Sequence, residues 1–463
     1  MTLAYRTKKS VGAVTKKEVT PSGIRPPKFI VGEELEYRAA RLFIFMGYFV
    51  RRGCPIYTVA NLDQATDLDV FALKYTQPFR RESIVSECKS GEVGPLDRIF
   101  WLSGVKQFVA AKEALLVRRA TKWNIKDFAK NTGVQIVDVA KIEELETNYR
   151  IGANEWPGVA DRNFYLTHVA DWNKSLVDSP SFWELYQTLI TEIRYDDPFA
   201  GINYLLFQLR RLTKQFRQIP TSVLHRFLIT ESLSQLSVFL MRIAEVAFDL
   251  LDKDRDAYIL KGLTYGSLDP KFAERILNSA YTITRQAVLH VTNKPLDIDR
   301  SFFQMPVPPG AENIRFLVNV ILREYPLSLT FPQVTDLLLR EVILKQNRSG
   351  GWLKRIFPSG DVSHRLELTR NYLKVLVDAE ACPRAFIDEL QVNTTENGIK
   401  NEAQASPIPE PTPKPSSLSN HNVSDIGTIP ASPNENGESS KPLQKPEQSQ
   451  DEKEFTLKPP NVK

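Results

Sequence analysis

The chain has 463 residues, of which 42% are hydrophobic and 25% charged, a composition typical of a globular protein with two or three domains. The net charge of +5 suits a polyanionic partner but does not require one, since a mild excess of Lys and Arg is common on protein surfaces. The sequence contains no G-x-x-x-x-G-K-[ST] loop, which argues against an NTPase of that class.

The three cysteines, Cys54, Cys88 and Cys382, are far apart and lack zinc-ligand spacing, which indicates a reducing compartment. No signal peptide is visible at the N-terminus. The most apolar run, "LFIFMGYFV", is too short to span a bilayer. We therefore expect a cytoplasmic protein without a membrane partner.

Residues 1–28 are polar and basic and predict a flexible arm, either resting on phosphates or simply solvated. Residues 29–150 alternate between helical and strand patterns. Their order is helix, three strands, helix, strand, helix, strand, with a glycine stop for the last helix at Gly133. This order predicts a small α/β domain with a mixed central sheet flanked by helices.

Residues 151–395 carry long helical patterns with Pro and Gly at the breaks, which predicts an all-α second domain. The tryptophans of its first part, Trp156, Trp172 and Trp183, are expected in its core. From residue 396 to the end the chain is rich in Pro, Ser, Asn, Glu and Lys and lacks the apolar content to fold. We expect a disordered tail over 396–463.

Deleting residues 400–463 is therefore expected to leave both stability and catalysis nearly unchanged, because this segment has few core-forming residues. Thermal unfolding of the full and truncated chains would check this. A clear drop in melting temperature on truncation would contradict it.

The stretch "TDLDVFALKYTQPFRRESIVSECKSG", residues 66–91, predicts two strands around a turn. Side chains alternate between the two faces of a strand, so Glu87 and Lys89 share one face. If Asp69 lies opposite Glu87, the hairpin is centred on Pro78, where "TQPF" is a reasonable turn.

Two carboxylates directly across a strand pair repel each other unless one is neutral or both share a cation. A hard divalent ion with oxygen ligands resolves the conflict, with a substrate phosphate completing its shell. Lys89 would then orient or deprotonate the attacking water, or hold a phosphate oxygen. The alternative is a surface hairpin with three charged residues on its wet face.

Glu36 favours a buried site over that alternative. It lies three, four and seven residues before Ala39, Ala40 and Phe43, so it shares a helix face with them. Small alanines let a helix approach a sheet closely, and a buried carboxylate without a role is costly.

Residues 32–146 resemble the PD-(D/E)xK, restriction-endonuclease-like nuclease superfamily, and look most like its Mrr-type branch. Glu36 followed by "MGYFV" is similar to that branch's acidic helix and strand entry. "DLDVFA" resembles its metal-binding strand, "ECK" matches the (D/E)xK signature, and "GVKQF" places Gln107 where relatives often carry a helix glutamine. "ALLVRR…FAKNTGVQIVD" resembles the closing unit.

The resemblance implies that Asp69, Glu87 and the Cys88 carbonyl bind Mg²⁺ or Mn²⁺. It also implies that Lys89 activates water and that Glu36 supports the site. The chain departs from the pattern at Leu68, where the family usually has glycine. Asp67, on the same strand face as Asp69, is therefore an alternative ligand.

The helical domain carries two basic pieces, "QLRRLTKQFRQ" and "KQNRSGGWLKR". They provide a possible phosphate track, with glycines and a tryptophan as a possible stacking platform. Solvated faces and a tight turn explain both pieces as well. The candidate nucleic-acid contacts are Arg210, Lys214, Arg217, Arg348 and Lys354.

Taken together, the patterns predict a metal-dependent endonuclease that hydrolyses phosphodiester bonds with a metal-activated water. DNA is the favoured substrate, although the sequence does not decide between DNA and RNA. The helical domain would serve targeting or assembly, as a homodimer or with a protein partner. The alternative is an inactive nuclease-fold module that binds nucleic acid or protein. The paired acids argue against it, because a retired site has no reason to keep clashing charges.

Overall fold

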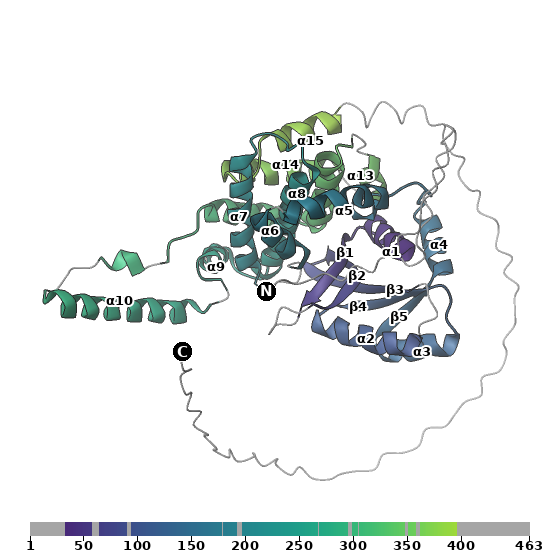
Figure 1. Cartoon of the computed structure of the whole chain (residues 1–463), viewed down its shortest axis with the longest axis horizontal. Coiled ribbons are helices and arrows are strands. Elements are labelled where there is room, and N and C mark those ends of the chain that lie inside the picture. The colour runs from purple at the N-terminus through teal and green to yellow at the C-terminus, as the bar shows by residue number, and fades with distance from the viewer. Residues whose placement is uncertain are drawn as a thin grey trace, which may run out of the picture. The chain divides into compact units, whose positions relative to one another are not determined.

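The computed structural model describes residues 33–57, 64–89, 94–177, 179–191, 197–266, 268–294, 299–303, 305–347, 351–357 and 362–395. The expected basic arm at 1–28 and the expected tail at 396–463 lie outside these ranges. The described residues belong to one compact unit, which contains an α/β part followed by a helical part (Figure 1).

The α/β part has a five-stranded mixed sheet in the strand order β1-β2-β3-β4-β5. The first three strands are antiparallel, and β3, β4 and β5 are parallel. Helix α1 packs against β1, β2 and β3, whereas α2 and α3 lie on the other side of the sheet (Figure 1). The elements are α1 Glu33–Phe45, β1 Phe49–Tyr57, β2 Gln64–Thr76, β3 Arg80–Lys89, α2 Pro95–Phe108, β4 Glu113–Arg118, α3 Trp123–Asn131, β5 Val134–Asp138 and α4 Val139–Asn148.

The predicted element order and the mixed sheet are confirmed, with one omission. The sequence pattern did not predict α4, a short helix that follows β5 without a loop. Gly133 ends α3 in the left-handed region with a φ of 73°, as its position in the sequence predicted.

The predicted register of the β2–β3 hairpin is also confirmed. Pairs run from Thr76↔Arg80 to Val70↔Ser86, so their index sum is constant and their centre is Pro78. Within the turn, Phe79 is fully buried and packs on Phe248 and Tyr325, at ring-centroid distances of 5.1 and 5.3 Å. The tip of the hairpin is therefore anchored in the helical part of the chain.

The helical part shows no strand among its described residues, as predicted. Its elements are η1 Gly158–Ala160, α5 Arg162–Val177, α6 Pro180–Thr191, α7 Pro198–Gln215, α8 Val223–Ala247, α9 Asp252–Tyr265, α10 Pro270–Thr292, η3 Arg300–Phe303, α11 Ala311–Arg323, η4 Leu327–Thr330, α12 Phe331–Leu338, the π-helical η5 Leu339–Leu344, α13 Gly351–Ile356, α14 Val362–Asp378 and α15 Ala385–Thr395. Within the described ranges, α8 alone is long and apolar enough to cross a membrane, and 94% of its apolar window is buried inside the protein. It packs against α7, α11 and α12 as the central helix of this part.

A buried network of four charged side chains joins the two parts. Arg51 of β1 donates from Nε to Glu231 of α8 at 2.7 Å and from Nη2 to Asp336 of α12 at 2.9 Å. Arg340 of η5 bonds the same two carboxylates. We call these four residues the interface network. Two guanidinium groups face two carboxylates in it, so the charges balance where water is excluded.

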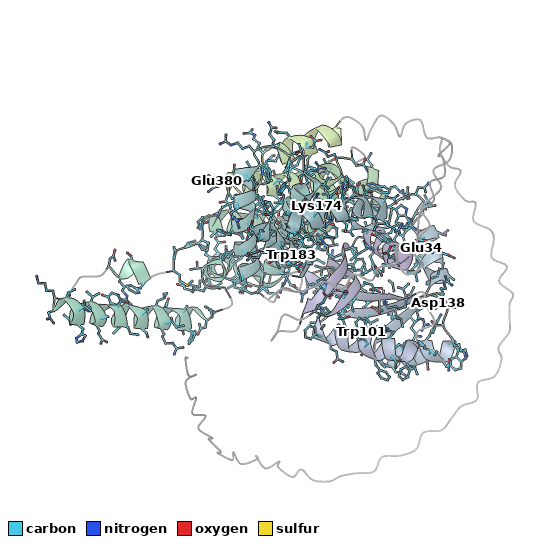
Figure 2. All side chains as sticks on the ribbon, viewed as in Figure 1. Glu34, Trp101, Asp138, Lys174, Trp183 and Glu380 are labelled. Carbon is cyan, nitrogen blue, oxygen red and sulfur yellow. The ribbon has the colours of Figure 1, made fainter. Side chains whose placement is uncertain are left out.

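The expected core position holds for one of the three tryptophans named above. Trp172 is buried, whereas Trp156 is half-buried and lies under the guanidinium of Arg41. Trp183, labelled in Figure 2, is on α6. It is 41% exposed, and its ring stacks on Tyr186. The prediction was wrong for Trp183, because the helical pattern does not show which face of α6 is covered.

Candidate active site

Asp69, near the middle of β2, meets Glu87 and Lys89 at the C-terminal end of β3. Lys89 Nζ lies 2.8 Å from Glu87 Oε1 and 3.3 Å from Asp69 Oδ2. The backbone N–H of Cys88 donates to the same Asp69 oxygen at 2.7 Å. The predicted convergence of the three side chains is confirmed, and we call them the charged cluster.

Strand geometry explains why these side chains meet. The β2–β3 ladder begins at Val70↔Ser86, so Asp69 and Glu87 follow in the same register. Lys89, two residues further along, returns to the face of Glu87. Cys88 lies between them and points the other way, and its thiol is buried. The N–H and C=O of a strand residue point toward the same neighbour, so the Cys88 carbonyl also faces the Asp69 side.

Helix α1 brings a third carboxylate, Glu36, toward the charged cluster. Ala39 and Ala40 are almost fully buried, which lets the helix lie close to the sheet as expected. The Glu36 side chain retains 25% of its exposure and lies 3.8 Å from Arg52 Nη1. The expectation of a shielded acid beside the cluster is thus confirmed in part, since Glu36 is half-buried and has a cationic neighbour.

Burial and mutual repulsion favour the neutral form of two carboxyl groups, Glu36 and Glu87. Burial and repulsion by Asp69 raise the pKa of Glu36 to about 7, against the opposing effect of Arg52 and Lys89. Burial and Asp69 also raise the pKa of Glu87, although Lys89 and Arg98 counteract them. An added cation would favour the charged form of both groups.

Lys89 is a charged donor rather than a base. Burial acts to lower its pKa, but the hydrogen bond that Lys89 donates to Glu87 and the charge of Asp69 outweigh burial, and the pKa is raised. Of the three roles considered for Lys89, this environment favours orienting water or holding a phosphate oxygen. It disfavours taking a proton from water.

Arg98 was not predicted and contributes to the cluster. It is on the first turn of α2, and its Nη1 lies 3.5 Å from Glu87 Oε1. A positional signal was present in the sequence, because the helix that follows β3 begins near the end of that strand. The pattern "GPLDRIF" therefore placed an arginine near the (D/E)xK motif.

Two sequence-based assignments are decided by the structure. Gln107 is exposed near the C-terminal end of α2, about 13 Å along the helix from Arg98, so its predicted place in the site was wrong. Asp67, the alternative to Asp69, is exposed and accepts a hydrogen bond from Gln64. Asp69 therefore belongs to the cluster and Asp67 does not.

No protein-family model, curated protein or solved structure matches this chain.

The donor set of the charged cluster fits Mg²⁺ or Mn²⁺. Within the ranges that the structure describes, no group of three or more His, Cys, Asp or Glu side chains is placed to hold a metal ion. Mg²⁺, however, commonly takes one or two carboxylates and completes its shell with waters and substrate phosphate. Asp69, Glu87 and the carbonyl of Cys88 would supply such a set of oxygens.

The predicted nucleic-acid contacts of the first basic piece do not share one helix face. Arg210 on α7 donates to the carbonyl oxygens of Ala379 and Pro309 at 2.9 and 3.0 Å, so internal contacts occupy its guanidinium. Lys214 is exposed near the end of α7, while Arg217 lies beyond that end, so the expected helix face was wrong.

The second basic piece is also partly internal. Lys345 is buried between Asp161 and Glu341, and Arg355 pairs with Glu155. Lys354 is on the exposed side of α13, and Arg348 lies outside the described residues. The sequence shows which residues are basic, but their partners come from segments up to 205 positions away.

Proposed function

We propose that the chain is a metal-dependent nuclease that hydrolyses phosphodiester bonds in DNA, with the charged cluster as its active site. The observation that carries the proposal is the convergence of Asp69, near the middle of β2, with Glu87 and Lys89 at the C-terminal end of β3. The Glu87 side chain is 3% exposed, and burying a carboxylate beside a second one lowers the free energy of unfolding. A catalytic role would account for an arrangement that costs stability. The resemblance of residues 32–146 to PD-(D/E)xK nucleases supports the same conclusion.

Asp69, Glu87 and the Cys88 carbonyl would hold the metal ion, which when bound lowers the pKa of water and stabilises charge on phosphate oxygens. Lys89, kept protonated by the two acids, would donate a hydrogen bond to a phosphate oxygen or orient the attacking water. Arg98, whose guanidinium approaches the same Glu87 oxygen as Lys89, would hold that carboxylate in place. Glu36 would handle a proton at the rim, since its pKa of about 7 suits proton exchange at neutral pH.

The inactive binding module stays a second candidate because of one contact pattern. Lys89 already pairs with both acids, so the cluster is partly neutralised by the chain itself. In such a module the acids would be structural, and no metal would be needed.

Incubation of the purified full chain with mixed DNA and RNA substrates, in Mg²⁺, Mn²⁺ or EDTA, tests the proposal. We expect DNA fragments in either metal and none in EDTA. Cleavage that persists in EDTA, or no cleavage of any substrate in metal, would refute it.

The Glu36→Gln variant separates the two candidates by activity. In a nuclease, loss of one positioned proton-handling group should slow cleavage on the order of 10²-fold. In a binding module, nucleic-acid binding should be unaffected. Unchanged cleavage in the variant would show that Glu36 does not belong to the catalytic site.

The same variant tests the burial of Glu36 through the pH dependence of stability. The carboxyl pKa is about 7 in the folded chain, against an ordinary value of 4.5 for glutamate, so the folded state binds more protons between these values. Raising the pH through this window therefore lowers the free energy of unfolding of the parent chain. In EDTA, Glu36→Gln should be more stable than the parent by on the order of 1–3 kcal/mol above the window, and equal to it below. Urea denaturation across the pH range measures this, and parallel curves for both proteins would contradict it.

A further inference from the structure

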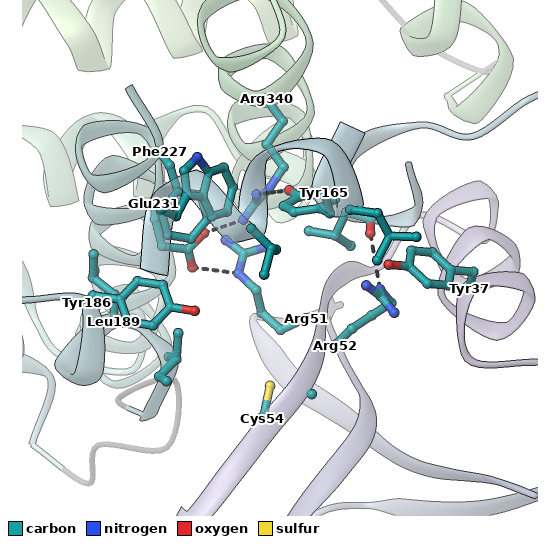
Figure 3. A pocket seen from close by; sticks show the side chains of 16 residues that line it. Tyr37, Arg51, Arg52, Cys54, Tyr165, Tyr186, Leu189, Phe227, Glu231 and Arg340 are labelled. Carbon is teal, nitrogen blue, oxygen red and sulfur yellow. Dashed lines mark hydrogen bonds and ion pairs between the residues drawn. The ribbon is translucent and has the colours of Figure 1, made fainter. Parts of the chain in front are cut away.

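A cavity of about 220 Å³ lies between the α/β part and the helical part (Figure 3). It is lined by β1, the start of η1 and helices α1, α5, α6 and α8, with Arg340 from η5. Gly53, Leu166 and Val169 line it and are exposed, so the cavity opens to solvent beside them. Drug-sized ligand pockets hold roughly 300–1,000 Å³, so this one suits a smaller molecule.

Aromatic rings from three helices form one wall of the cavity. Trp172 of α5 packs on Phe227 of α8 at a centroid distance of 4.7 Å, and Tyr186 of α6 lies 6.0 Å from the same ring. Tyr165 meets Trp172 edge-on at 6.0 Å. Figure 3 shows Tyr186 and Phe227 on one side of the cavity and Tyr37 on the other. Such walls favour a flat, polarizable ligand.

The arginines that line the cavity do not make it an anion site. Arg51 and Arg340 belong to the interface network, where Glu231 and Asp336 balance their charges. Arg52 has Glu36 as its acidic neighbour. A phosphate would have to compete with these carboxylates, whereas a neutral ring would not.

One polar group in the wall has no partner. Among the described residues, the indole Nε1 of Trp172 is buried without a hydrogen-bond acceptor, although the residue is only 5% exposed. A buried donor left unpaired is costly. This nitrogen has less than 1 Å² of accessible surface, so an acceptor on the ring edge of a ligand would satisfy it only if the Trp172 ring turns toward the cavity on binding.

We propose that this cavity binds a single nucleobase. A nucleobase is flat, uncharged, small enough for the volume, and carries carbonyl and ring-nitrogen acceptors on its edge. Such a base comes either from a free nucleoside or from an unstacked position of a nucleic-acid strand. The strand source rests on the proposed nuclease function, and the free source does not.

Arg52 links the cavity to the charged cluster. It lines the cavity, lies over the Tyr37 ring at 3.4 Å from its centroid, and donates to the carbonyl oxygen of Val159 at 3.2 Å. Its Nη1 is 3.8 Å from Glu36. A base held against Arg52 would therefore lie beside the candidate active site.

The first arm of the test measures free nucleosides. Adenosine, guanosine, cytidine, uridine and thymidine are each added to the full chain in EDTA, and thermal unfolding is followed. A ligand that binds only the folded state raises the melting temperature with concentration. EDTA removes any contribution from the metal, so this arm is independent of cleavage.

The second arm measures a base within a strand. Single-stranded DNA carrying 5-iodouracil is irradiated with the protein in EDTA, and the cross-linked peptide is identified by mass spectrometry. A base in the cavity should cross-link to the peptides that contain Trp172 or Tyr186. Duplex DNA with the same base serves as the stacked comparison.

Matched variants assign the signal to the cavity. Val169→Trp fills the mouth and should weaken nucleoside binding, or reduce cross-linking, at least about tenfold. Val177→Trp places the same ring on the same helix, at a residue that is 78% exposed and outside the cavity, and should have no effect. Trp172→Phe keeps an aromatic ring without the donor and should weaken binding roughly three- to tenfold. If Val169→Trp does not fold, Leu166→Trp provides the same block.

A signal in either arm that the mouth-filling variant removes supports the proposal and names the source of the base. No signal in either arm, or a signal that Val169→Trp or Leu166→Trp leaves unchanged, overturns it. Cleavage without base binding would leave the nuclease proposal standing and refute this one. Base binding without cleavage would support this proposal and refute the nuclease proposal.

Discussion

Replacing Asp69 with alanine is expected to lower DNA cleavage by on the order of 10³-fold or more. Asp69 and Glu87 are the two side-chain carboxylates of the charged cluster, and Lys89 pairs with both. Without Asp69, one carboxylate remains to hold a metal ion, and Lys89 loses one of the two acids that position it. Single-turnover cleavage of a labelled DNA duplex in Mg²⁺ measures the effect.

Asp67→Ala is the matched control, since it removes an exposed acid two residues away on the same strand. It should cleave at the parent rate. Asp69→Ala should also fold, because the lost hydrogen bond from Cys88 costs about 1 kcal/mol and the relief of Glu87 opposes this cost. Equal loss of activity in both variants would show that strand β2, rather than the cluster, was disturbed. Full activity of Asp69→Ala would refute the active-site assignment.

Replacing Glu231 with glutamine is expected to lower the free energy of unfolding by about 3–5 kcal/mol. Glu231 is 3% exposed and pairs with both Arg51 and Arg340. Its neutralisation leaves Asp336 as the one network acid facing two buried guanidinium groups. An unpaired charge in a site without water is among the most costly single changes in a folded chain. Urea denaturation followed by circular dichroism measures the loss.

Glu184→Gln, the same substitution at an exposed position of α6, should change stability by less than about 0.5 kcal/mol. Because Arg51 is on β1, the Glu231 variant should also loosen the contact between the sheet and the helical part. Limited proteolysis measures this loosening. If the Glu231→Gln variant is cut at the same rate as the parent chain, the network does not couple the two parts. A cost below about 1 kcal/mol would show that water reaches the network.

Local chain geometry explains why the sequence predicted the charged cluster. Strand side chains alternate with a period of two, which puts Glu87 and Lys89 on one face wherever the strand lies. A short turn centred on Pro78 leaves one register for the hairpin, and this register brings Asp69 opposite Glu87. Helical spacing placed Glu36 with the two alanines that bring α1 close. Each of these relations spans fewer than about 20 residues and follows from backbone periodicity.

Tertiary packing decided the rest, because the partners come from distant segments. Asp67 and Asp69 share a strand face, so local pattern could not separate them, and only the folded cluster did. Gln107 was on the correct helix but at its wrong end, while Arg98 reaches Glu87 from the first turn. Arg210 meets carbonyl groups 99 and 169 positions away, so a basic run in the sequence became an internal contact. The interface network and the aromatic cavity likewise join segments more than 100 residues apart, and no periodicity within one segment specifies such contacts.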